Sequence, residues 1–373
     1  MIIGIDASRA TTSRRTGTEA YAYHLIRAFL PLTAERGHRL RLYFNQAPAG
    51  DLFPVSEHVE RVVIPQRRLW THLRLGRELR RRPPDVFFTP AHVIPIGYRG
   101  PAVATIHDLG YEQFPEAYPR RQLVYLRWST RHNARTAHRV IADSIATRDD
   151  LMRFYGTDAA KIDVVYPGAD PDLRRAEDET QIAEALTRRG IRSPYLLYLG
   201  TLQPRKNLVR LVEAFAVGGL HQQGYSLVLA GKAGWLAQPI LDAIGHQPSA
   251  IRDCIHVTGY VDEADKAALL SGATALTFPS LYEGFGFPVL EAQACGTAVV
   301  CANTSSLPEV AGEGALLVDP LDTAALAEAM RRVAGDANLR QSLVAAGYAN
   351  LDRFSWPDAA VRVLDVLEAA AVF

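Results

Sequence analysis

Two glutamates and an arginine–lysine pair are the residues of this chain whose types and spacing could do chemistry. Glu283 and Glu291 lie eight residues apart, and Arg205 and Lys206 are adjacent earlier in the chain. Carboxylates accept hydrogen bonds from vicinal hydroxyl groups, such as those of ribose or a hexose. Arginine and lysine hold phosphate through charge-assisted hydrogen bonds that contribute roughly 1.5–3 kcal/mol each. A ligand with a sugar, a diphosphate and a ribose in a row would engage all four side chains.

A strand and a helix must position the two glutamates. Residues 273–278 form a short apolar run typical of a buried parallel strand, and Pro288 fits the first turn of a following helix. Gly284 and Gly286 let the backbone approach a ligand, and the helix N-terminus offers N–H groups to a phosphate. The alternative is a surface loop before an ordinary helix. Four apolar side chains argue against that alternative: Phe285, Phe287, Val289 and Leu290.

The cation pair follows a second predicted strand. The apolar residues 195–199 end at Gly200, and a helix is predicted to start just after Pro204. Cations at a helix N-terminus oppose the helix dipole, so an anion at this point would explain Arg205 and Lys206. A solvated helix start is the alternative.

The segment Glu-Gly-Phe-Gly-Phe-Pro-x-x-x-Glu-Ala, with its two glutamates, resembles the E-x7-E signature of retaining glycosyltransferases of the GT-B fold, family 4. This segment and the earlier segment Gly-Thr-Leu-x-Pro-Arg-Lys-Asn are similar in sequence to those of a subgroup that includes mannosyltransferases of bacterial polysaccharide assembly. The resemblance covers essentially the whole chain. It implies that Glu283 contacts the donor hexose, that Glu291 holds the ribose hydroxyls, and that Arg205 and Lys206 bind the donor diphosphate.

The resemblance also assigns residues elsewhere in the chain. Gly17 and Thr18 match a glycine-rich loop near the donor diphosphate, although Glu19 stands where a second glycine is common. His107 matches a histidine near the reacting sugar; the alternative is a loop histidine beside a turn. The predicted catalytic residues are His107, Glu283, Arg205 and Lys206. The predicted donor-binding residues are Gly17, Thr18, Gly200, Arg205, Lys206, Tyr260, Val261, Glu283, Gly284, Phe285, Gly286, Phe287, Val289, Leu290 and Glu291, with the nucleotide base read through the backbone of Tyr260 and Val261.

Strands alternate with helices along the whole chain, which indicates parallel sheets covered on both faces. We therefore predict an α/β protein of the GT-B type, with two Rossmann-like domains whose sheets face a central cleft. The boundary falls near Pro167 and Gly168. This gives an acceptor-side domain over residues 1–168 and a nucleotide-sugar domain over 169–355, with a last helix at 356–373 that packs back on the first. Predicted strands are residues 2–5, 40–44, 62–64, 86–88, 103–106, 140–142, 162–165, 195–199, 226–229, 255–257, 275–278, 299–302 and 316–318, and predicted helices in the first half are 20–32, 69–81, 122–137 and 147–154.

Composition excludes several classes of protein. With 48% hydrophobic and 22% charged residues, the 373-residue chain is typical of a folded globular protein. The N-terminus has no signal-peptide pattern, and no apolar stretch reaches the roughly 20 residues that a membrane span requires. Three cysteines without paired spacing argue for a reducing compartment and against a zinc site. We therefore expect a cytoplasmic protein.

Positive charge gathers in the first half of the chain. Residues 1–168 carry 25 Lys and Arg against 16 Asp and Glu, whereas the remainder carries 16 against 24. The stretch from Arg67 to Arg82 combines arginines with leucines and Trp70. It is either a surface helix for anionic lipid at the inner face of the membrane or for a lipid diphosphate acceptor, or a solvated face whose leucines enter the core. Five arginines could extend that surface: Arg120, Arg121, Arg127, Arg131 and Arg135. Nucleic acid is a poor alternative partner because no recognition motif accompanies the charge.

The sequence thus predicts a retaining glycosyltransferase that moves a hexose from a nucleoside-diphosphate sugar to a glycan or lipid-linked acceptor, without a metal or other cofactor. GDP-mannose is the leading donor. A GT-B sugar epimerase and a non-catalytic nucleotide-sugar-binding or membrane-associated assembly protein remain alternatives. A dinucleotide oxidoreductase is disfavoured because no G-x-G-x-x-G follows the first strand.

Overall fold

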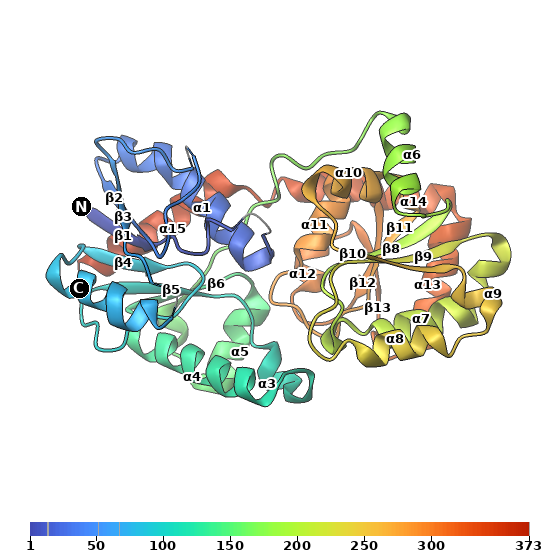
Figure 1. Cartoon of the computed structure of the whole chain (residues 1–373), viewed down its shortest axis with the longest axis horizontal. Coiled ribbons are helices and arrows are strands. Elements are labelled where there is room, and N and C mark those ends of the chain that lie inside the picture. The colour runs from blue at the N-terminus through green and yellow to red at the C-terminus, as the bar shows by residue number, and fades with distance from the viewer. Residues whose placement is uncertain (13–14, 51, 67, 373) are drawn as a thin grey trace. The chain divides into compact units, whose positions relative to one another are not determined.

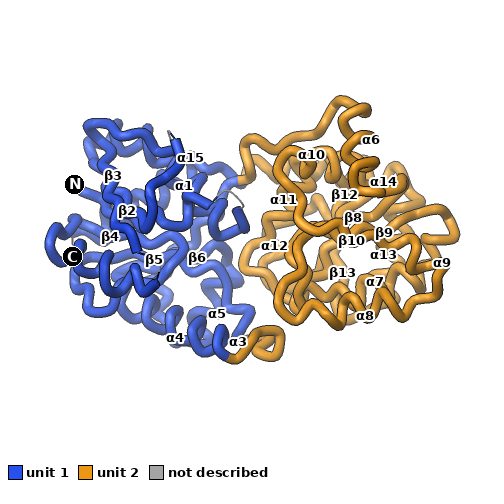
Figure 2. The backbone as a smooth tube through the Cα atoms, viewed as in Figure 1, with its two compact units in different colours: residues 1–112, 121–168, 354–373 blue, residues 113–120, 169–353 orange. Residues whose placement is uncertain are grey.

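Runs of buried apolar residues build one parallel sheet in each of two units. The computed structural model describes residues 1–12, 15–50, 52–66 and 68–372. Unit 1 comprises Met1–Glu112, Arg121–Gly168 and Phe354–Phe373, and unit 2 comprises Gln113–Arg120 and Ala169–Arg353 (Figure 2). The chain therefore returns to unit 1 after completing unit 2.

The sheet of unit 1 has the strand order β3-β2-β1-β4-β5-β6-β7, and neighbouring strands run parallel. Its central strands are buried along their whole length, as expected where helices cover both faces of a parallel sheet. The strands are β1 (Ile2–Asp6), β2 (Arg39–Phe44), β3 (Val59–Val63), β4 (Val86–Thr89), β5 (Ala102–Ile106), β6 (Arg139–Ala142) and β7 (Ile162–Val164).

Helices cover both faces of this sheet. Figure 1 shows α1 (Gly17–Glu35) and α15 (Trp356–Ala371) on one face and α4 (Arg120–Thr136) and α5 (Ile145–Tyr155) on the other. The rings of His24 on α1 and Trp356 on α15 stack with centroids 5.3 Å apart. The shorter elements of unit 1 are the π-helical turn η1 (Trp70–Leu75), α2 (Gly76–Arg81), α3 (Gly110–Gln113) and the 3-10 turn Ala159–Lys161, whereas the 3-10 turn Pro115–Ala117 belongs to unit 2.

The sheet of unit 2 has the order β10-β9-β8-β11-β12-β13, again with parallel neighbours. Counted from its first strand, this is the order 3-2-1-4-5-6 of the doubly wound nucleotide-binding fold. Its strands are β8 (Tyr195–Leu199), β9 (Ser226–Ala230), β10 (Ile255–Gly259), β11 (Ala275–Phe278), β12 (Ala298–Ala302) and β13 (Ala315–Val318).

The helices of unit 2 lie on two sides of its sheet, with α7, α8 and α13 on one side and α6, α10, α11 and α14 on the other (Figure 1). Their bounds are α6 (Glu179–Arg188), α7 (Leu208–Gly218), α8 (Gln238–Gly245), α9 (Ser249–Arg252), α10 (Glu263–Gly272), α11 (Phe287–Ala294), α12 (Leu307–Ala311), α13 (Thr323–Gly335) and α14 (Ala337–Leu351), with 3-10 turns at Pro204–Lys206 and Leu220–Gln223.

The predicted fold class, with parallel sheets in two Rossmann-like units, is confirmed. Each predicted strand lies within a few residues of an observed one. The predicted helix over residues 69–81 is confirmed only in its second half: Gly76–Arg81 form α2, whereas Trp70–Leu75 form the π-helical turn η1. Arg67 lies outside the described residues. Among the described residues, no helix combines the length and hydropathy that a membrane span needs.

Candidate active site

The loops that follow β8 and β11 leave adjacent strands at the centre of the unit 2 sheet. The strand order proceeds from β8 towards β10 on one side and from β11 towards β13 on the other. The carboxyl ends of β8 and β11 therefore form the topological switch point, where open α/β sheets bind ligands. The loop after β8 carries Arg205 and Lys206, and the loop after β11 carries Glu283. Three of the predicted site residues therefore meet at this point.

The loops that follow β8 and β9 approach each other closely just before Arg205 and Lys206 in the first of them. Gly200 and Gly231 have φ angles of 147° and 153°. A Cβ atom at Gly231 would lie 1.9 Å from the Gly200 carbonyl oxygen, so no larger residue fits there. The 3-10 turn Pro204–Lys206 comes next, and Asn207 follows in the left-handed region with φ 60°. The α-helix therefore starts at Leu208 and not just after Pro204 as the sequence predicted.

This turn is tied to neighbouring loops of the same unit. Asn207 Nδ2 donates hydrogen bonds to the carbonyl oxygens of Pro279 and Pro320, at 3.1 and 2.7 Å. The backbone N–H of Leu281 donates to the carbonyl oxygen of Arg205 at 2.9 Å. The cation pair is therefore held in a fixed relation to the loop that carries Glu283.

Glu283 forms ion pairs with both cations. Its Oε2 lies 3.5 Å from Arg205 Nη1, its Oε1 accepts a hydrogen bond from Lys206 Nζ, and all three side chains are largely buried. Burial alone would raise the pKa of Glu283, but Lys206 and Arg205 outweigh it and hold that pKa below its usual value. Glu283 is therefore a carboxylate at neutral pH. The sequence predicted the three residues as ligand contacts but not their mutual pairing.

Two serines after β12 fix the backbone of Glu283. Ser305 Oγ accepts a hydrogen bond from the N–H of Glu283 at 2.9 Å. Ser306 Oγ lies 2.9 and 2.6 Å from the carbonyl oxygens of Glu283 and Phe285, which share its single O–H donor. Neither serine was predicted as a site residue. The signal that could have found them is the polar run at residues 303–306, which follows a buried strand directly.

Helix α11 starts where the sequence predicted. Gly286 is its N-cap with φ 116°, and Pro288 lies in its first turn. A Cβ atom at Gly286 would lie 2.8 Å from Leu307 Cδ2, so packing as well as backbone angle favours glycine. The rings of Phe285 and Phe287 meet edge to face with centroids 5.1 Å apart. The glycine-rich turn is therefore a packed element and not a solvated loop.

Two residues predicted to bind the donor belong to the core. The side chains of Val289 and Leu290 are 0% and 1% exposed. They pack inside unit 2, so a ligand contact at this point would fall to backbone groups of the preceding turn, which includes Gly284.

Glu291 has a cationic partner of its own. Lys266 Nζ on α10 lies 2.9 Å from Glu291 Oε1 and 2.8 Å from Glu263 Oε2. Burial alone would lower the pKa of Lys266, but Glu291 and Glu263 outweigh it and raise that pKa. Lys266 was not predicted as a site residue. Lysine is scarce in this arginine-rich chain, which drew attention to Lys206 and could have done the same for Lys266.

The residues predicted to read the nucleotide base follow β10. The carbonyl oxygen of Tyr260 accepts a hydrogen bond from Arg189 Nη1 at 3.4 Å, and Val261 is buried. Asp262 then caps α10 by accepting from the N–H of Asp265 at 3.0 Å. The Tyr260 carbonyl oxygen is therefore already engaged by Arg189, and base recognition through the backbone of Tyr260 and Val261 stays a prediction.

In unit 1, Gly17 and Thr18 form the first turn of α1. Thr16 is the N-cap, and Glu19 closes a capping box with it, with the N–H of Thr16 donating to Glu19 Oε2 at 2.9 Å. Glu19 Oε1 also lies 3.5 Å from Arg9 Nη1. The glutamate found where a second glycine is common therefore stabilises the start of this helix.

His107, at the carboxyl end of β5, uses both ring nitrogens. Its Nδ1 lies 2.5 Å from Asp143 Oδ2, and its Nε2 donates to the carbonyl oxygen of Pro90 at 2.7 Å. Burial alone would lower the pKa of His107, but Asp143 outweighs it and raises that pKa. Tyr21 packs against the ring edge to face, with centroids 4.9 Å apart. His107 is thus paired with Asp143, a partner that the sequence did not predict.

Comparison with known proteins gives the family of this chain. The family profile described as Glycosyltransferase Family 4 matches residues 15–173, and the profile described as Glycosyl transferases group 1 matches residues 185–350. Together they match most of the chain. The chain belongs to the GT-B glycosyltransferases of family 4. The O-antigen chain mannosyltransferase B of Escherichia coli is 28% identical over 313 residues, which are 84% of this chain and 80% of that protein. This family-4 glycosyltransferase therefore resembles the mannosyltransferase-like subgroup.

Other relatives of this family-4 glycosyltransferase differ in their substrates. The D-inositol 3-phosphate glycosyltransferase of Xylanimonas cellulosilytica is 34% identical over 239 residues, which are 62% of this chain and 57% of that protein. Among solved structures, the sucrose-phosphate synthase of Thermosynechococcus elongatus superposes with a TM-score of 0.76 at 20% identity, covering 99% of this chain and 98% of that one. This likeness shows the shared fold.

The structure thus brings together only part of the predicted site of this glycosyltransferase. Arg205, Lys206 and Glu283 are in contact in unit 2, whereas Glu291 is joined to Lys266. The predicted residues Gly17, Thr18 and His107 belong to unit 1. Within the described residues, no group of three His, Cys, Asp or Glu side chains could hold a metal ion.

Proposed function

We propose that this family-4 glycosyltransferase transfers mannose from GDP-mannose, with retention at the anomeric carbon, to a glycan or lipid-linked acceptor in cell-surface polysaccharide assembly. The observation that carries the proposal is the buried cluster of Arg205, Lys206 and Glu283 at the β8/β11 switch point. A cluster of two cations and one carboxylate suits a ligand in which a diphosphate adjoins a sugar.

The two cations hold the donor diphosphate. A guanidinium has five N–H donors and an ammonium three, so each cation can bind a phosphate oxygen while it still contacts Glu283. Because Glu283 keeps both charges in place before the donor arrives, little reorganisation is needed when negative charge develops on the leaving diphosphate. The cations supply the neutralisation that a metal ion gives in other phosphate sites, so transfer proceeds without a metal or other cofactor.

The two glutamates bind different parts of the donor. Glu283, fixed by Lys206 and by Ser305 and Ser306, accepts hydrogen bonds from hydroxyl groups of the hexose. Glu291 accepts hydrogen bonds from the ribose hydroxyls while Lys266 holds its other oxygen. The nucleotide therefore lies along the carboxyl ends of the unit 2 strands, from the β11 loop towards β10.

The proton of the acceptor hydroxyl moves to the departing phosphate oxygen. The bond between the anomeric carbon and the diphosphate breaks, and the bond to the acceptor oxygen forms on the same face of the sugar, so the anomeric configuration is kept. His107 does not take this proton, because both of its ring nitrogens are already hydrogen-bonded, one to Asp143 and the other to the carbonyl oxygen of Pro90. Its raised pKa also favours a ring that already carries its proton. It contributes positive charge in unit 1.

The similarity to O-antigen chain mannosyltransferase B supports mannose as the sugar. The test is thermal stabilisation by GDP, UDP, dTDP and ADP, each with and without magnesium. A nucleotide at about 100 times its dissociation constant stabilises the folded state by roughly 2.7 kcal/mol. Stabilisation by GDP alone, unchanged by magnesium, is expected. Stabilisation by a different nucleotide would show that the donor carries that nucleotide and not GDP. If no nucleotide stabilises the protein, the proposal is overturned.

Retention and the acceptor class need a second experiment. Purified protein is given GDP-mannose and a mannose-terminated oligosaccharide, and the product is examined by proton NMR. An α-linked product from the α-linked donor is expected. A β-linked product would contradict retention, and a free epimerised sugar without transfer would identify an epimerase.

A further inference from the structure

The switch point of the unit 1 sheet holds a buried carboxylate with an unused oxygen. From β1 the sheet continues to β2 and β3, and from β4 it continues to β5, β6 and β7, so the carboxyl ends of β1 and β4 form this switch point. Asp6 is the last residue of β1 and is 2% exposed. Its Oδ2 is buried and accepts no hydrogen bond from any of the described residues. A buried oxygen without a donor is costly, so it indicates a ligand that supplies one.

The other oxygen of Asp6 fixes the direction of its carboxylate. Oδ1 accepts hydrogen bonds from the N–H and the Oγ of Ser8, at 3.1 and 2.6 Å, and Ser8 is itself buried. Between them, the N–H of Ala7 donates to the carbonyl oxygen of Tyr43 in β2 at 3.0 Å. The loop that leaves β1 therefore holds the carboxylate in place, so little ordering is needed when a ligand binds to Oδ2.

His92, in the loop after β4, supplies a hydrogen-bond donor at the same ends of the strands. Its Nε2 accepts a hydrogen bond from Arg9 Nε at 2.9 Å, so this nitrogen carries no proton and Nδ1 carries one. Burial lowers the pKa of His92; the charge of Asp6 opposes this shift, and that of Arg9 adds to it. Asn133 Nδ2 anchors the loop by donating to the carbonyl oxygen of His92 at 2.9 Å. The neutral ring therefore offers an N–H, and Asp6 is near enough to act on its charge.

The guanidinium of Arg9 already has partners in this group of residues. Its Nη1 lies 3.5 Å from Glu19 Oε1, and its Nε donates to His92. Within the group, the carboxylates of Asp6 and Glu19 outnumber the single cation. A phosphate at Asp6 Oδ2 would therefore be repelled, whereas a hydroxyl group can donate to that oxygen.

We propose that Asp6 and His92 bind the terminal sugar of an uncharged glycan acceptor, with one hydroxyl donating to Asp6 Oδ2 and another accepting from His92 Nδ1–H. The assignment rests on the glycosyl transfer proposed above and specifies the acceptor of that reaction. A carboxylate and an imidazole N–H are suitable partners for sugar hydroxyl groups. Since the acceptor proton moves to the departing phosphate in that transfer, Asp6 selects and orients the acceptor and takes no proton.

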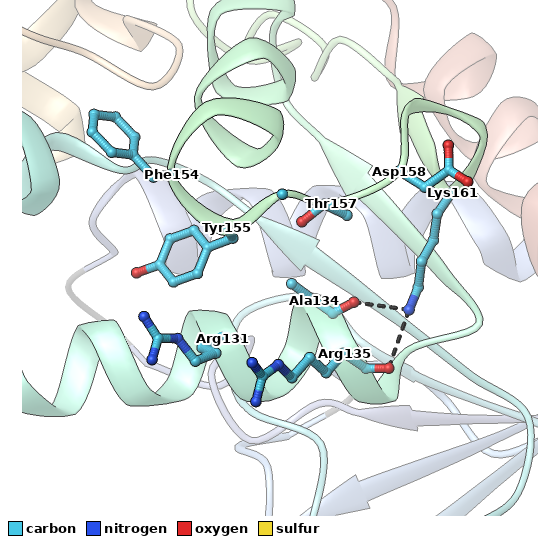
Figure 3. Close-up of a pocket in the computed structure, with 9 residues that line it drawn as sticks. Arg131, Ala134, Arg135, Phe154, Tyr155, Thr157, Asp158 and Lys161 are labelled. Atoms are coloured by element: carbon cyan, nitrogen blue, oxygen red, sulfur yellow. Dashed lines mark hydrogen bonds between the residues drawn. The ribbon is translucent and has the colours of Figure 1, made fainter.

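A hollow of about 480 Å³ in unit 1 lies at the opposite ends of the strands. Its lining comes from the ends of α4 and α5 and from residues just before β7, so it adjoins the amino ends of β6 and β7. Figure 3 shows Arg131 and Arg135 extending from α4, while Lys161 Nζ donates to the carbonyl oxygens of Ala134 and Arg135, at 2.8 and 3.2 Å. Because open α/β sheets bind ligands at the carboxyl ends of their strands, we assign the acceptor to Asp6 and not to this hollow.

The experiment measures the dissociation constant of a mannose-terminated oligosaccharide for the full chain by saturation-transfer NMR, with and without GDP. Asp6→Asn should weaken binding roughly tenfold, because a hydrogen bond to a charged group is lost, and His92→Phe about fivefold. Asp6→Asn keeps an oxygen for Ser8, so its thermal midpoint should stay that of the parent. The same oligosaccharide phosphorylated on O6 of its terminal mannose should bind the parent roughly tenfold more weakly.

Two control variants should bind the oligosaccharide as the parent does. Asp85→Asn changes a carboxylate at the amino ends of the same two strands, where Oδ2 accepts a hydrogen bond from the N–H of Ile2 at 2.6 Å. Arg135→Gln changes the lining of the hollow. Weakened binding in Arg135→Gln with unchanged binding in Asp6→Asn would assign the sugar to the hollow and overturn the proposal.

Monodeoxy analogues of the terminal mannose separate direct contact from a structural effect. Removal of the hydroxyl that Asp6 binds should weaken binding to the parent roughly tenfold and binding to Asp6→Asn no further. Equal losses in the two proteins, unchanged affinity in Asp6→Asn, or a preference for the phosphorylated oligosaccharide would overturn the proposal. If Asp6→Asn lowers the thermal midpoint, the same comparison is made with His92→Phe.

Transfer assays distinguish failure of this acceptor site from failure of the proposed function. Asp6→Asn should raise the KM for the oligosaccharide while GDP affinity stays within about twofold, because Asp6 belongs to unit 1. An unchanged KM in an active Asp6→Asn variant would overturn the acceptor site alone. A parent that binds the oligosaccharide through Asp6 but neither binds GDP nor transfers mannose would overturn the proposed function and keep the sugar site.

Discussion

Lys266 Nζ lies 2.9 Å from Glu291 Oε1, and both side chains are largely shielded from solvent. If Glu291 binds the ribose, Lys266 is a positioning residue for that contact. Lys266→Met should weaken nucleotide binding about tenfold, because a lost charge-assisted hydrogen bond costs about 1.5–3 kcal/mol. The affinity lost should be the part contributed by the ribose hydroxyls. Calorimetry with GDP and 2′-deoxy-GDP should therefore show a smaller difference in affinity between the two nucleotides in the variant than in the parent.

The control for Lys266 is Glu263→Gln. Glu263 is the more exposed partner of Lys266, so its removal leaves the pair with Glu291 intact and should change nucleotide affinity less than about twofold. An unchanged preference for GDP over 2′-deoxy-GDP in Lys266→Met would contradict the positioning role.

The stability losses caused by removing Glu283 and Lys206 should not be additive, because the two side chains form a buried ion pair. Glu283→Gln leaves Arg205 and Lys206 without their carboxylate and should lower the free energy of unfolding by about 3 kcal/mol. Combined with Lys206→Met, the loss should be smaller than the sum of the single losses. Urea denaturation of the two single variants and the double variant measures this; strict additivity would show that the pair is not coupled. Turnover should fall sharply in all three, since donor binding uses both residues.

The same carboxylate predicts how stability depends on pH. Because the folded pKa of Glu283 is below its unfolded value, its contribution is fully present above the unfolded pKa of about 4.3 and is lost as the pH falls through the folded pKa. The difference in urea midpoint between the parent and Glu283→Gln should therefore be constant from pH 5 to 7 and shrink in more acidic solution. A difference that grows on acidification would have the wrong sign.

His107 should lose its charge when its counterion is removed. Asp143 holds the pKa of His107 above its usual value against the effect of burial, so Asp143→Asn should leave the ring neutral at pH 7. Nitrogen-15 NMR of labelled histidine reports this directly. We expect kcat to fall roughly tenfold or more, and nucleotide affinity to stay within about twofold, because His107 acts in unit 1. Asp163→Asn, which breaks the ion pair with Arg139 in the same sheet, is the control for general destabilisation. A ring that remains charged would contradict the pairing.

Much of this fold could be predicted because its sheets are buried on both faces. Such strands read as unbroken apolar runs, and Tyr195–Leu199 and Ala275–Phe278 were predicted to the residue. The start of α11 was predictable from two nearby residues: Gly286 adopts the positive φ angle of the turn, and Pro288 favours the first turn of a helix. Glu283, Arg205 and Lys206 could be chosen because they follow the ends of such strands.

Partners that come from distant parts of the chain could not be predicted. Lys266 meets Glu291 and Asp143 meets His107 across 25 and 36 residues. The members of each pair belong to different elements, so no local periodicity of the sequence connects them. The sequence left two alternatives for the stretch from Arg67 to Arg82, because an apolar side can face a membrane or the core; Trp70 is in fact buried. The 3-10 turn before α7 depends on the left-handed conformation of Asn207, which its bonds to two distant prolines stabilise.

Helix α15 has a consequence for the synthesis of the chain. It packs against α1 and the residues that follow α1: Arg36 Nη1 lies 2.6 Å from Asp365 Oδ1, and His38 Nε2 lies 2.7 Å from Glu368 Oε1. All the residues of unit 2 precede α15 in the chain. On the ribosome, the whole of unit 2 has therefore emerged before unit 1 receives its last helix. Until then the side of α1 that meets Trp356 is uncovered, so unit 1 exposes apolar surface for as long as unit 2 is being made.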